Sequence, residues 1–215
     1  MAHHDDFATE PLPGLPERPP AGEEVLWQGR PDAWALAREA FGLRWIMGYF
    51  ALVVLWRASD GWLAAGPAGA LALALPYVAL AGLAALVILW MARAQARATV
   101  YTITTNRVVL RVGAALSVTY NLPFSRLEGA ALDMRGDGIA TIALALPEGE
   151  RLPYLSLWPH VRPWHLRAPQ PALRCIPDAE QVSARLAAAA ASRLHRPVIE
   201  RRSPIRANTA AVAAE

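Results

Sequence analysis

The sequence predicts an α+β membrane protein in which a two-helix transmembrane hairpin precedes a small β-sheet or barrel capped by a C-terminal helix. Apolar residues bunch between positions 40 and 92 of the 215 residues, and the mean hydropathy is positive at +0.22. Strand-like alternation begins only after Arg97, and residues 178–194 repeat apolar side chains at helical spacing. Lipid is therefore the expected solvent of much of the first half, and water that of the second.

The N-terminal segment, residues 1–31, is predicted to be a flexible, acidic, proline-rich tail. Its first 24 residues carry six carboxylates and five prolines but few apolar side chains, which is too little burial to offset the entropy of ordering. Residues 1–6 lack the basic and apolar regions of a cleaved signal peptide. The N-terminus is therefore expected to stay on the side of the membrane where it is made.

The first predicted span covers residues 41–56, within a hairpin region that runs from 32 to 97. Asp32 is positioned to cap a helix that becomes wholly apolar after Arg44. Because the uninterrupted apolar stretch is short for a bilayer that needs roughly 20 residues, the Arg44 guanidinium is expected to snorkel outward. A helix that enters the membrane only partly is the alternative.

The second predicted span covers residues 71–92. No charged residue occurs from Gly61 to Ala92, a stretch that as one straight helix would exceed a hydrocarbon core about 30 Å thick. The Gly- and Pro-rich residues 61–70, GWLAAGPAGA, are therefore assigned to a loop or interfacial turn before the second span. Amphipathic tryptophans and arginines are expected near the membrane interfaces, at Arg44, Trp45, Trp56, Trp62, Trp90 and Arg93.

The distribution of arginine predicts that both termini are cytoplasmic. All the basic residues counted in the composition are arginines, and cytoplasmic segments next to spans are enriched in them. Only Arg57 lies between the spans, whereas the flanks carry Arg30, Arg38, Arg44, Arg93, Arg97, Arg107 and Arg111. Residues 57–70 should then face the periplasm.

A cytoplasmic β-rich domain is placed at residues 98–194. Two runs, ATVYTIT and RVVLRVG, flank Thr105-Asn106, which is typical of a tight hairpin turn. The run IATIALALP predicts a further strand with Ile142, Leu144 and Leu146 on one face, and RLPYLSLW is interpreted as the next short strand. Several short strands in succession favour a small antiparallel sheet or barrel.

A closing helix is predicted from Asp178 to Leu194. Asp178 with Gln181 fits a capping box. The helix carries one apolar stripe that needs a sheet or a partner to cover it, made of Val182, Leu186, Ala189, Ala190 and Leu194. Residues 195–215, rich in Pro, Arg and Ala, are assigned to a flexible C-terminal tail.

The segment from Tyr101 to Arg107, YTITTNR, continuing to Gly113, resembles the opening of bacterial pleckstrin-homology-like domains. In those proteins it commonly follows a two-helix membrane hairpin. The resemblance implies a small curved sheet closed by a C-terminal helix. It implies a fold and no particular function.

A narrower resemblance covers almost the whole length. It rests on HHDDFATEPLPGLPE, LWQGRPDAWALAREAF, YLSLWPHVRPW and LRCIPDAEQV, which are similar to segments of the PuhB-type family of photosynthetic-complex assembly proteins of purple bacteria and their relatives. The resemblance implies a factor in the inner (intracytoplasmic) membrane that helps to assemble the reaction centre and, secondarily, its light-harvesting 1 antenna. The implied partners are reaction-centre subunits, light-harvesting 1 components and the lipid bilayer.

The richest local pattern is residues 157–165, LWPHVRPWH. Its prolines stiffen the backbone, and Trp and Arg often dominate the energy of interfaces. The candidate partner-binding residues are Trp158, His160, Arg162 and Trp164. In a structural alternative, the tryptophans fill the edge of the core and the prolines end a strand. Ligation of a metal or of bacteriochlorophyll by His160 and His165 is a weaker alternative, because no Cys or carboxylate lies nearby in sequence.

Composition and motifs argue against several classes of protein. The net charge is only +3 and the arginines are scattered, which disfavours nucleic acid as a partner. The single cysteine, Cys175, forms neither an intramolecular disulfide nor, by itself, a thiolate metal site. Near the first hairpin the sequence supplies only Arg107 and Arg111. Two arginines predict loose attraction to anionic lipid, without specific head-group recognition. No catalytic constellation, metal site or cofactor motif stands out, so no enzyme is expected.

Two function hypotheses remain. The first is a non-enzymatic membrane assembly factor for the photosynthetic reaction centre that docks subunits through its hairpin and its cytoplasmic domain. The alternative is a membrane-tethered lipid-binding or envelope-homeostasis module with the same architecture. Small residues such as Ala72, Gly82 and Ala85 would also permit close helix approach in a homo-oligomer.

Overall fold

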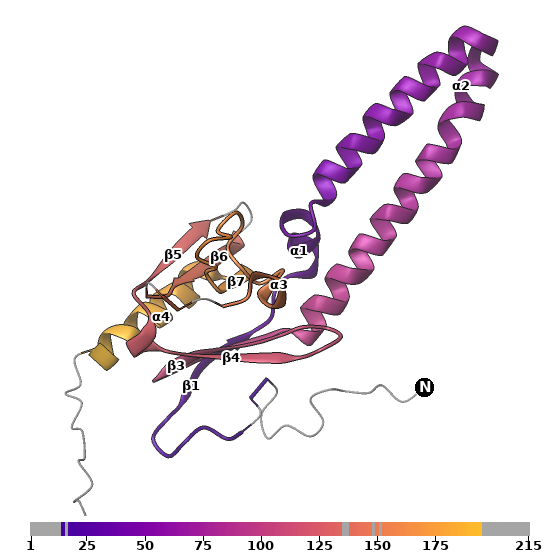
Figure 1. Ribbon diagram of the computed structural model, residues 1–215. Coiled ribbons are helices and arrows are strands. Elements are labelled where there is room, and N and C mark those ends of the chain that lie inside the picture. Colours follow the sequence, from indigo (N-terminus) through magenta and orange to yellow (C-terminus); the bar gives the residue numbers. More distant parts are fainter. Residues whose placement is uncertain (1–13, 16, 135–137, 148, 151, 195–215) are drawn as a thin grey trace, which may run out of the picture.

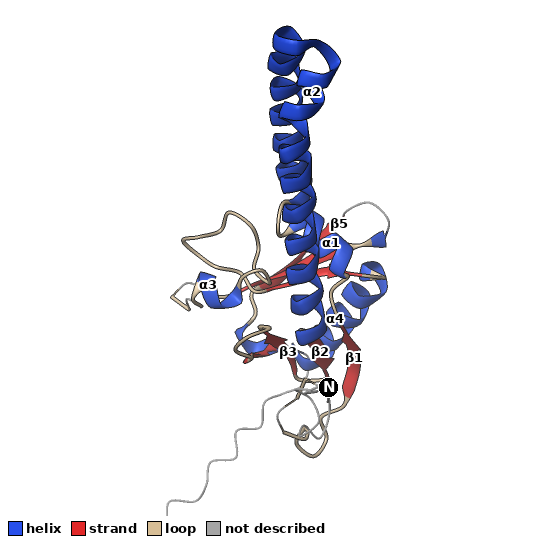
Figure 2. Cartoon of the chain, turned by 90° about the vertical axis from the view of Figure 1, so that its right-hand side faces the viewer, coloured by secondary structure: helices blue, strands red, loops and turns tan. Residues whose placement is uncertain are grey.

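The computed structural model describes residues 14–15, 17–134, 138–147, 149–150 and 152–194. Residues 1–13 and 16 of the predicted N-terminal tail lie outside the described residues. The whole predicted C-terminal tail, residues 195–215, lies outside them too. A long helical element projects from one end of a β-rich domain (Figure 1). Figure 2 shows the same projection after a turn of 90°.

Residues 25–29, which the sequence assigned to a flexible tail, form strand β1 (Val25–Gly29), so that assignment is wrong for this segment. Strand β1 pairs antiparallel with β2 (Val100–Thr104), and Trp27 packs against the core of the domain. Just before β1, Arg107 Nε donates to Glu23 Oε1 at 2.7 Å. Because the pairing strand is distant in the chain, local composition carries no sign of it.

Helix α1 (Ala33–Glu39) begins at the predicted cap. The backbone N–H of Ala35 donates to Asp32 Oδ1 at 2.7 Å, which confirms the cap. Gly42 then precedes the long element α2 (Leu43–Ala98) with a φ of 67°. Glycine adopts this left-handed conformation without the steric cost of a Cβ atom.

Element α2 is interrupted at Ala65 and Gly66, whose backbone angles are not helical. Pro67 follows the break, at the start of a helical arm where a missing N–H costs little. The two arms run side by side from the break back to the domain (Figure 1). The break lies inside residues 61–70, where a loop or interfacial turn was predicted. A loop over the whole segment is wrong, because it is helical on both sides of this short break.

The arms expose most of their apolar side chains. Element α2 is long and apolar enough to cross a membrane, by length and composition, and only 6% of its most apolar 18-residue window is buried. Burial is concentrated near the domain, where Ala37 of α1 packs with Leu43 and Ala92. At the other end a Cβ atom on Gly61 would collide with the carbonyl of Gly69, so glycines let the arms approach closely.

Two antiparallel sheets form the domain. The first has the order β1-β2-β3-β4, with β3 at Arg107–Val112 and β4 at Val118–Pro123. The short helix η1 (Phe124–Arg126) leads to the second sheet, of order β5-β6-β7, with strands at Gly129–Met134, Ala140–Ala145 and Ala172–Ile176. The predicted turn at Thr105-Asn106 is confirmed between β2 and β3, where Thr104 Oγ1 accepts from the N–H groups of Asn106 and Arg107.

The core lies between the sheets and helix α4 (Ala179–Leu194), which confirms the predicted closing helix. Its stripe contributes buried Val182, Leu186 and Ala189 and half-buried Ala190, while the side chain of Leu194 lies outside the described part. The largest fully buried contributions from the strands are Tyr101, Ile103, Leu110, Ile142, Leu144, Leu173 and Ile176.

The segment RLPYLSLW, predicted as a strand, instead contains the short helix α3 (Tyr154–Leu157). Proline at 153 and 159 lacks the N–H that a strand ladder requires, which accounts for the difference. Leu157, the last residue of α3, is buried, and Tyr120 Oη donates to Ser156 Oγ at 2.8 Å. This contact holds α3 against β4.

Candidate functional site

A groove of about 580 Å³ opens where the arms of α2 join the domain. We call it the junction groove. It is formed by the end of α1, the start of α2, α3, β7 and the loop after α3. Its lining residues are Glu39, Ala40, Gly42, Trp45, Tyr154, Trp158, Pro163, Trp164, Leu166 and Arg174. Three tryptophans from two distant parts of the chain thus share one surface.

Trp158 and Trp164, two of the predicted docking residues, both line the junction groove. The Trp158 ring lies edge-on to Phe41, with centroids 5.1 Å apart and planes at 81°. Trp164 is 92% exposed, and its φ of 64° is uncommon for a residue other than glycine. Such backbone outliers cluster at functional sites, which makes Trp164 the stronger candidate for a contact residue.

Arg162 makes hydrogen bonds across the loop after α3 and does not line the groove. Its guanidinium Nη1 donates to Gln170 Oε1 at 3.0 Å, and its backbone N–H donates to Gln170 O at 2.9 Å. These two bonds hold the ends of the segment 162–170 together. The arrangement gives Arg162 a positioning role.

His160 is fully buried beneath the groove, so the prediction that it contacts a partner is wrong. Its Nε2 lies 2.9 Å from Thr99 Oγ1, and its Nδ1 lies 2.6 Å from Tyr101 Oη. Since both ring nitrogens already have hydrogen-bond partners, His160 offers none to a metal or pigment. His165 Nδ1 lies 2.8 Å from the Pro163 carbonyl. The ligand-pair alternative therefore loses its geometric basis.

Hydrogen bonding favours the neutral form of His160. Tyr101 Oη accepts from the Arg174 backbone N–H at 3.2 Å, which leaves the phenol hydrogen to point at His160 Nδ1. Nε2 then donates to Thr99. Burial, and next the positive charge of Arg174, lower the pKa of His160 to about 3. Burial likewise raises the pKa of Tyr101, so both side chains are neutral at physiological pH.

Arg174 connects three parts of the molecule and was missed from sequence. From β7, its Nη1 donates to Pro159 O at 3.2 Å and its Nη2 to Glu39 O at 3.1 Å. Within the described residues its buried Nε has no hydrogen-bond partner. The available signal was an arginine inside the apolar run ALRCI. Arg174 thus holds the groove loop against the end of α1.

The six predicted membrane-interface residues occupy two levels of the arms. Arg44, Trp45, Trp90 and Arg93 are exposed near the domain, whereas Trp56 and Trp62 are exposed nearer the break at Ala65. The tryptophans are between 58% and 85% exposed. They are therefore available to an interface, as their predicted role requires.

Among the described residues, no group of three or more His, Cys, Asp or Glu side chains is arranged to hold a metal ion. At the junction groove the structure assembles a surface of aromatic side chains. Tryptophan and tyrosine side chains line it. Arg174 donates hydrogen bonds to the carbonyls of Pro159 and Glu39, and His160 is buried below the groove.

The comparisons with known proteins agree with this architecture. The family model of the bacterial PH domain matches residues 48–190, which begin in the first arm and end in α4. The chain is 47% identical over 201 residues to a Rhodobacter capsulatus protein named as an uncharacterized 23.7 kDa protein in the puhA 5′ region, covering 93% of this chain and 94% of that protein. No solved structure matches. The chain therefore belongs to the bacterial PH domain family.

Proposed function

We propose that this chain is a non-enzymatic membrane assembly factor for the photosynthetic reaction centre and, secondarily, for its light-harvesting 1 antenna. The observation that carries the proposal is the 47% identity, over 93% of the chain, to the Rhodobacter capsulatus protein of the puhA 5′ region. A relative in that region supports a role in photosynthesis. The resemblance of YLSLWPHVRPW to the PuhB-type family gives the role its specific form.

In this proposal the two arms of α2 form a transmembrane hairpin in the bacterial inner membrane, with both termini in the cytoplasm. Their exposed apolar surface supports it, because side chains such as Leu63 and Leu71, 86% and 71% exposed, are poorly accommodated by water. Trp45 and Trp62 are separated by about 25 Å along the first arm at 1.5 Å per residue. This distance is close to a hydrocarbon thickness of about 30 Å.

An ion pair lies on the first arm between Trp56 and Trp62. Arg57 Nη1 is 3.2 Å from Asp60 Oδ2, and the Arg57 guanidinium lies 5.9 Å from the Tyr77 ring centroid on the other arm. An unpaired charge is costly in hydrocarbon, whereas an ion pair beside an aromatic face reduces that cost. The pairing makes a continuous membrane arm through Arg57 compatible with insertion.

The junction groove would dock the cytoplasmic segment of a reaction-centre subunit. Since the groove lies at the base of the arms, a subunit whose membrane helix packs on the arms would present its adjoining segment to Trp158 and Trp164. Exposed tryptophans supply large rigid contact area at small entropic cost. One partner would thereby contact both parts of the chain.

Deletion of the gene in a photosynthetic host tests the proposal. We expect reaction-centre absorbance per cell to fall and to return when the wild-type gene is restored, while total membrane protein stays constant. Affinity purification of the tagged chain from the same membranes should recover reaction-centre subunits. Normal reaction-centre and antenna levels in the deletion strain, accompanied by altered lipid composition or envelope sensitivity, would favour the lipid or envelope module instead.

A further inference from the structure

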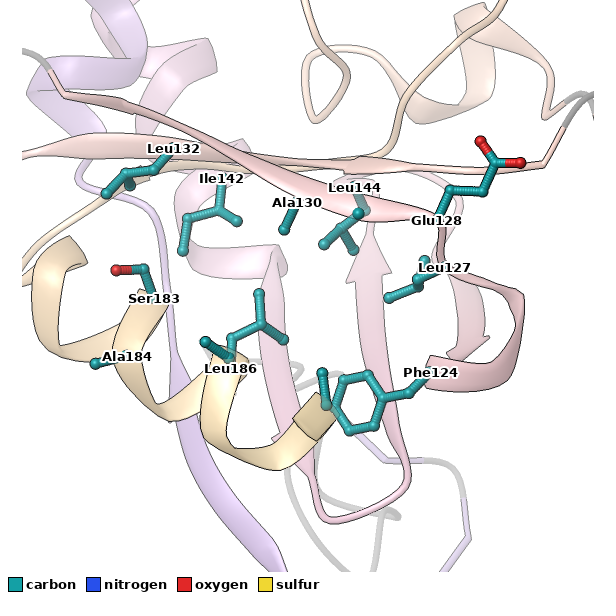
Figure 3. A pocket seen from close by; sticks show the side chains of 13 residues that line it. Phe124, Leu127, Glu128, Ala130, Leu132, Ile142, Leu144, Ser183, Ala184 and Leu186 are labelled. Carbon is teal, nitrogen blue, oxygen red and sulfur yellow. The ribbon is translucent and has the colours of Figure 1, made fainter. Parts of the chain in front are cut away.

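A second cavity, of about 470 Å³, lies between the second sheet and α4 (Figure 3). We call it the β5–α4 groove. On the sheet side, Ala130 and Leu132 of β5 and Ile142 and Leu144 of β6 face the groove, opposite Leu186 of α4. The other α4 residues that line it are small: Ser183, Ala184, Ala187 and Ala190. Small side chains on the helix leave the space open.

One wall of this groove is an unpaired sheet edge. In the described part of the chain β5 pairs with β6 alone, and all six of its residues are exposed. Most native proteins cover or blunt such an edge, because its backbone N–H and C=O groups are ready to pair with another strand. The apolar residues Leu132 and Met134 on this edge, 41% and 44% exposed, do not blunt it.

The ladder identifies which backbone groups of β5 point outward. The N–H of Leu144 donates to Pro171 O at 2.8 Å, on the side of β7, and Leu144 lies directly opposite Ala130. In an antiparallel ladder, a residue bonded to one neighbouring strand faces the other strand as a non-hydrogen-bonded pair. The N–H and C=O groups of Ala130 therefore point away from β6, and so do those of Leu132, two residues on.

The outward backbone groups and the groove belong to the same residues. Ala130 and Leu132 offer their N–H and C=O groups to the edge and their side chains to the groove. A strand added beside β5 would pair with these groups. Because side chains alternate along a strand, every second side chain of that strand would lie over the groove against α4.

We propose that the β5–α4 groove binds an extended peptide segment of another protein as a fourth strand of the second sheet, with apolar side chains at alternate positions. An acyl chain would suit the apolar walls, but it has no groups that hydrogen-bond to the outward N–H and C=O groups of β5. A peptide has such groups and is therefore the better match. The exposed carboxylate of Glu128, where the chain enters β5, complements a basic residue near one end of that peptide. This surface is separate from the junction groove, and the inference does not depend on the proposed function.

The test uses the full chain in phospholipid nanodiscs and a phage library of random decapeptides, with empty nanodiscs to remove background binders. We expect enriched peptides with alternating apolar residues. They should bind at least about tenfold more weakly to Ala187→Trp, whose indole fills the groove. Ala188→Trp is the matched control, because residue 188 is exposed on α4 but does not line the groove, and it should bind like wild type.

A second variant tests the backbone contribution. Ala130→Pro removes an outward N–H while keeping the ladder to β6, since proline is tolerated where the N–H faces off the sheet. It should also weaken binding about tenfold, as should N-methylation of the peptide amides that face β5. Circular dichroism of each variant verifies the fold. Hydrogen exchange at the β5 amides should slow when peptide is added.

Several results would overturn the proposal. One is the absence of peptides enriched above empty nanodiscs, and another is binding that survives both Ala187→Trp and Ala130→Pro in folded protein. Binding of palmitate that is lost in Ala187→Trp and kept in Ala130→Pro would assign the groove to an acyl chain. Dimers of the chain that form without peptide and are lost in Ala130→Pro would assign the edge to a second copy.

Discussion

The β-rich domain and the arms of α2 contain similar apolar residues, but the domain core buries them and the arms expose them. In the domain, Ile103, Leu110 and Leu144 have no exposed surface. In the arms, Trp45 and Leu63 are 85% and 86% exposed. The domain thus buries the apolar residues of its core, whereas the arms expose most of theirs. The same substitution should therefore change the fold in the domain and the membrane insertion in the arms.

The largest expected effect separates these regions by placing a carboxylate in each. Leu186→Asp puts an unpaired charge into the domain core, which should cost several kcal/mol and unfold the domain. Leu52→Asp, at a side chain 70% exposed on the arm, should leave the domain folded. In lipid it should instead disfavour insertion by about 3 kcal/mol. Hydrogen exchange of β3 amides reports the first effect, and membrane fractionation reports the second.

The comparison fails if the two variants behave alike. A folded domain in Leu186→Asp would mean that α4 does not cover the sheets. Loss of the domain fold in Leu52→Asp would mean that the exposed arm surface packs against the domain. Leu52→Ala is the matched control, because it removes the same contacts without adding charge, and it should fractionate with the membrane.

Sequence patterns located the parts of the fold that depend on neighbours in the chain. The Asp32 cap, the turn at Thr105-Asn106 and the stripe of α4 are each defined within a few residues, and the structure contains all three. Strand β1 depends on pairing with β2, far along the chain, so composition alone suggested a tail. The reversal at Ala65 and Gly66 lies within the predicted turn, but the helix that continues on both sides of it was missed, because small apolar residues fit a loop and a helix equally well.

The second prediction concerns Arg174, the connection between the two regions. Arg174→Leu removes the donors to Pro159 O and Glu39 O and leaves both carbonyls without these bonds. Each unsatisfied buried group costs about 1–3 kcal/mol, so the loss of both bonds should lower the stability of the domain by roughly 2–6 kcal/mol. Denaturant unfolding of the full chain in detergent measures the loss. Arg174→Lys, which keeps the charge but cannot reach both carbonyls at once, should recover only part of it.

The third prediction is a pH dependence that only the domain should show. Because the pKa of His160 is about 3 in the fold and about 6.5 in the unfolded chain, the unfolded state binds the proton first as pH falls. Stability is therefore fully present above pH 6.5 and decreases between pH 6.5 and 3. From pH 7 to pH 5 the decrease should be about 2 kcal/mol.

His160→Gln provides the control for this dependence, because the amide does not titrate in this range. Its unfolding free energy should be lower at pH 7 but flatter between pH 7 and pH 5. An equal slope in the variant and the wild type would show that other groups produce the pH dependence.

The candidate site was only partly visible in the sequence, for a physical reason. The run LWPHVRPWH pointed to the correct loop, and Trp158 and Trp164 do line the junction groove. The orientation of each side chain depends on contacts made by distant residues. Thr99 and Tyr101 draw His160 inward, and Gln170 holds Arg162 away from the groove. No local pattern distinguishes those two residues from the tryptophans.

The smallest expected effect on stability is at Trp164, where the comparison between regions is sharpest. Trp164 belongs to the domain but is 92% exposed, as the arm residues are. Trp164→Ala should therefore change the unfolding free energy by no more than about 0.5 kcal/mol. If the junction groove docks a reaction-centre subunit, the same change should cost about 2 kcal/mol of binding, which is more than a tenfold loss of affinity.

Two matched variants decide whether this loss belongs to the groove. Leu155→Ala removes an equally prominent apolar side chain, 87% exposed, that does not line the groove, and its affinity should match wild type. Trp158→Ala also loses the edge-on contact with Phe41, so it should cost about 1 kcal/mol of stability as well as affinity. Biolayer interferometry of purified reaction centres against each variant in nanodiscs measures the affinities. Equal affinities for wild type, Trp164→Ala and Leu155→Ala would exclude the junction groove as the docking surface and assign the contact to the arms or to the β5–α4 groove.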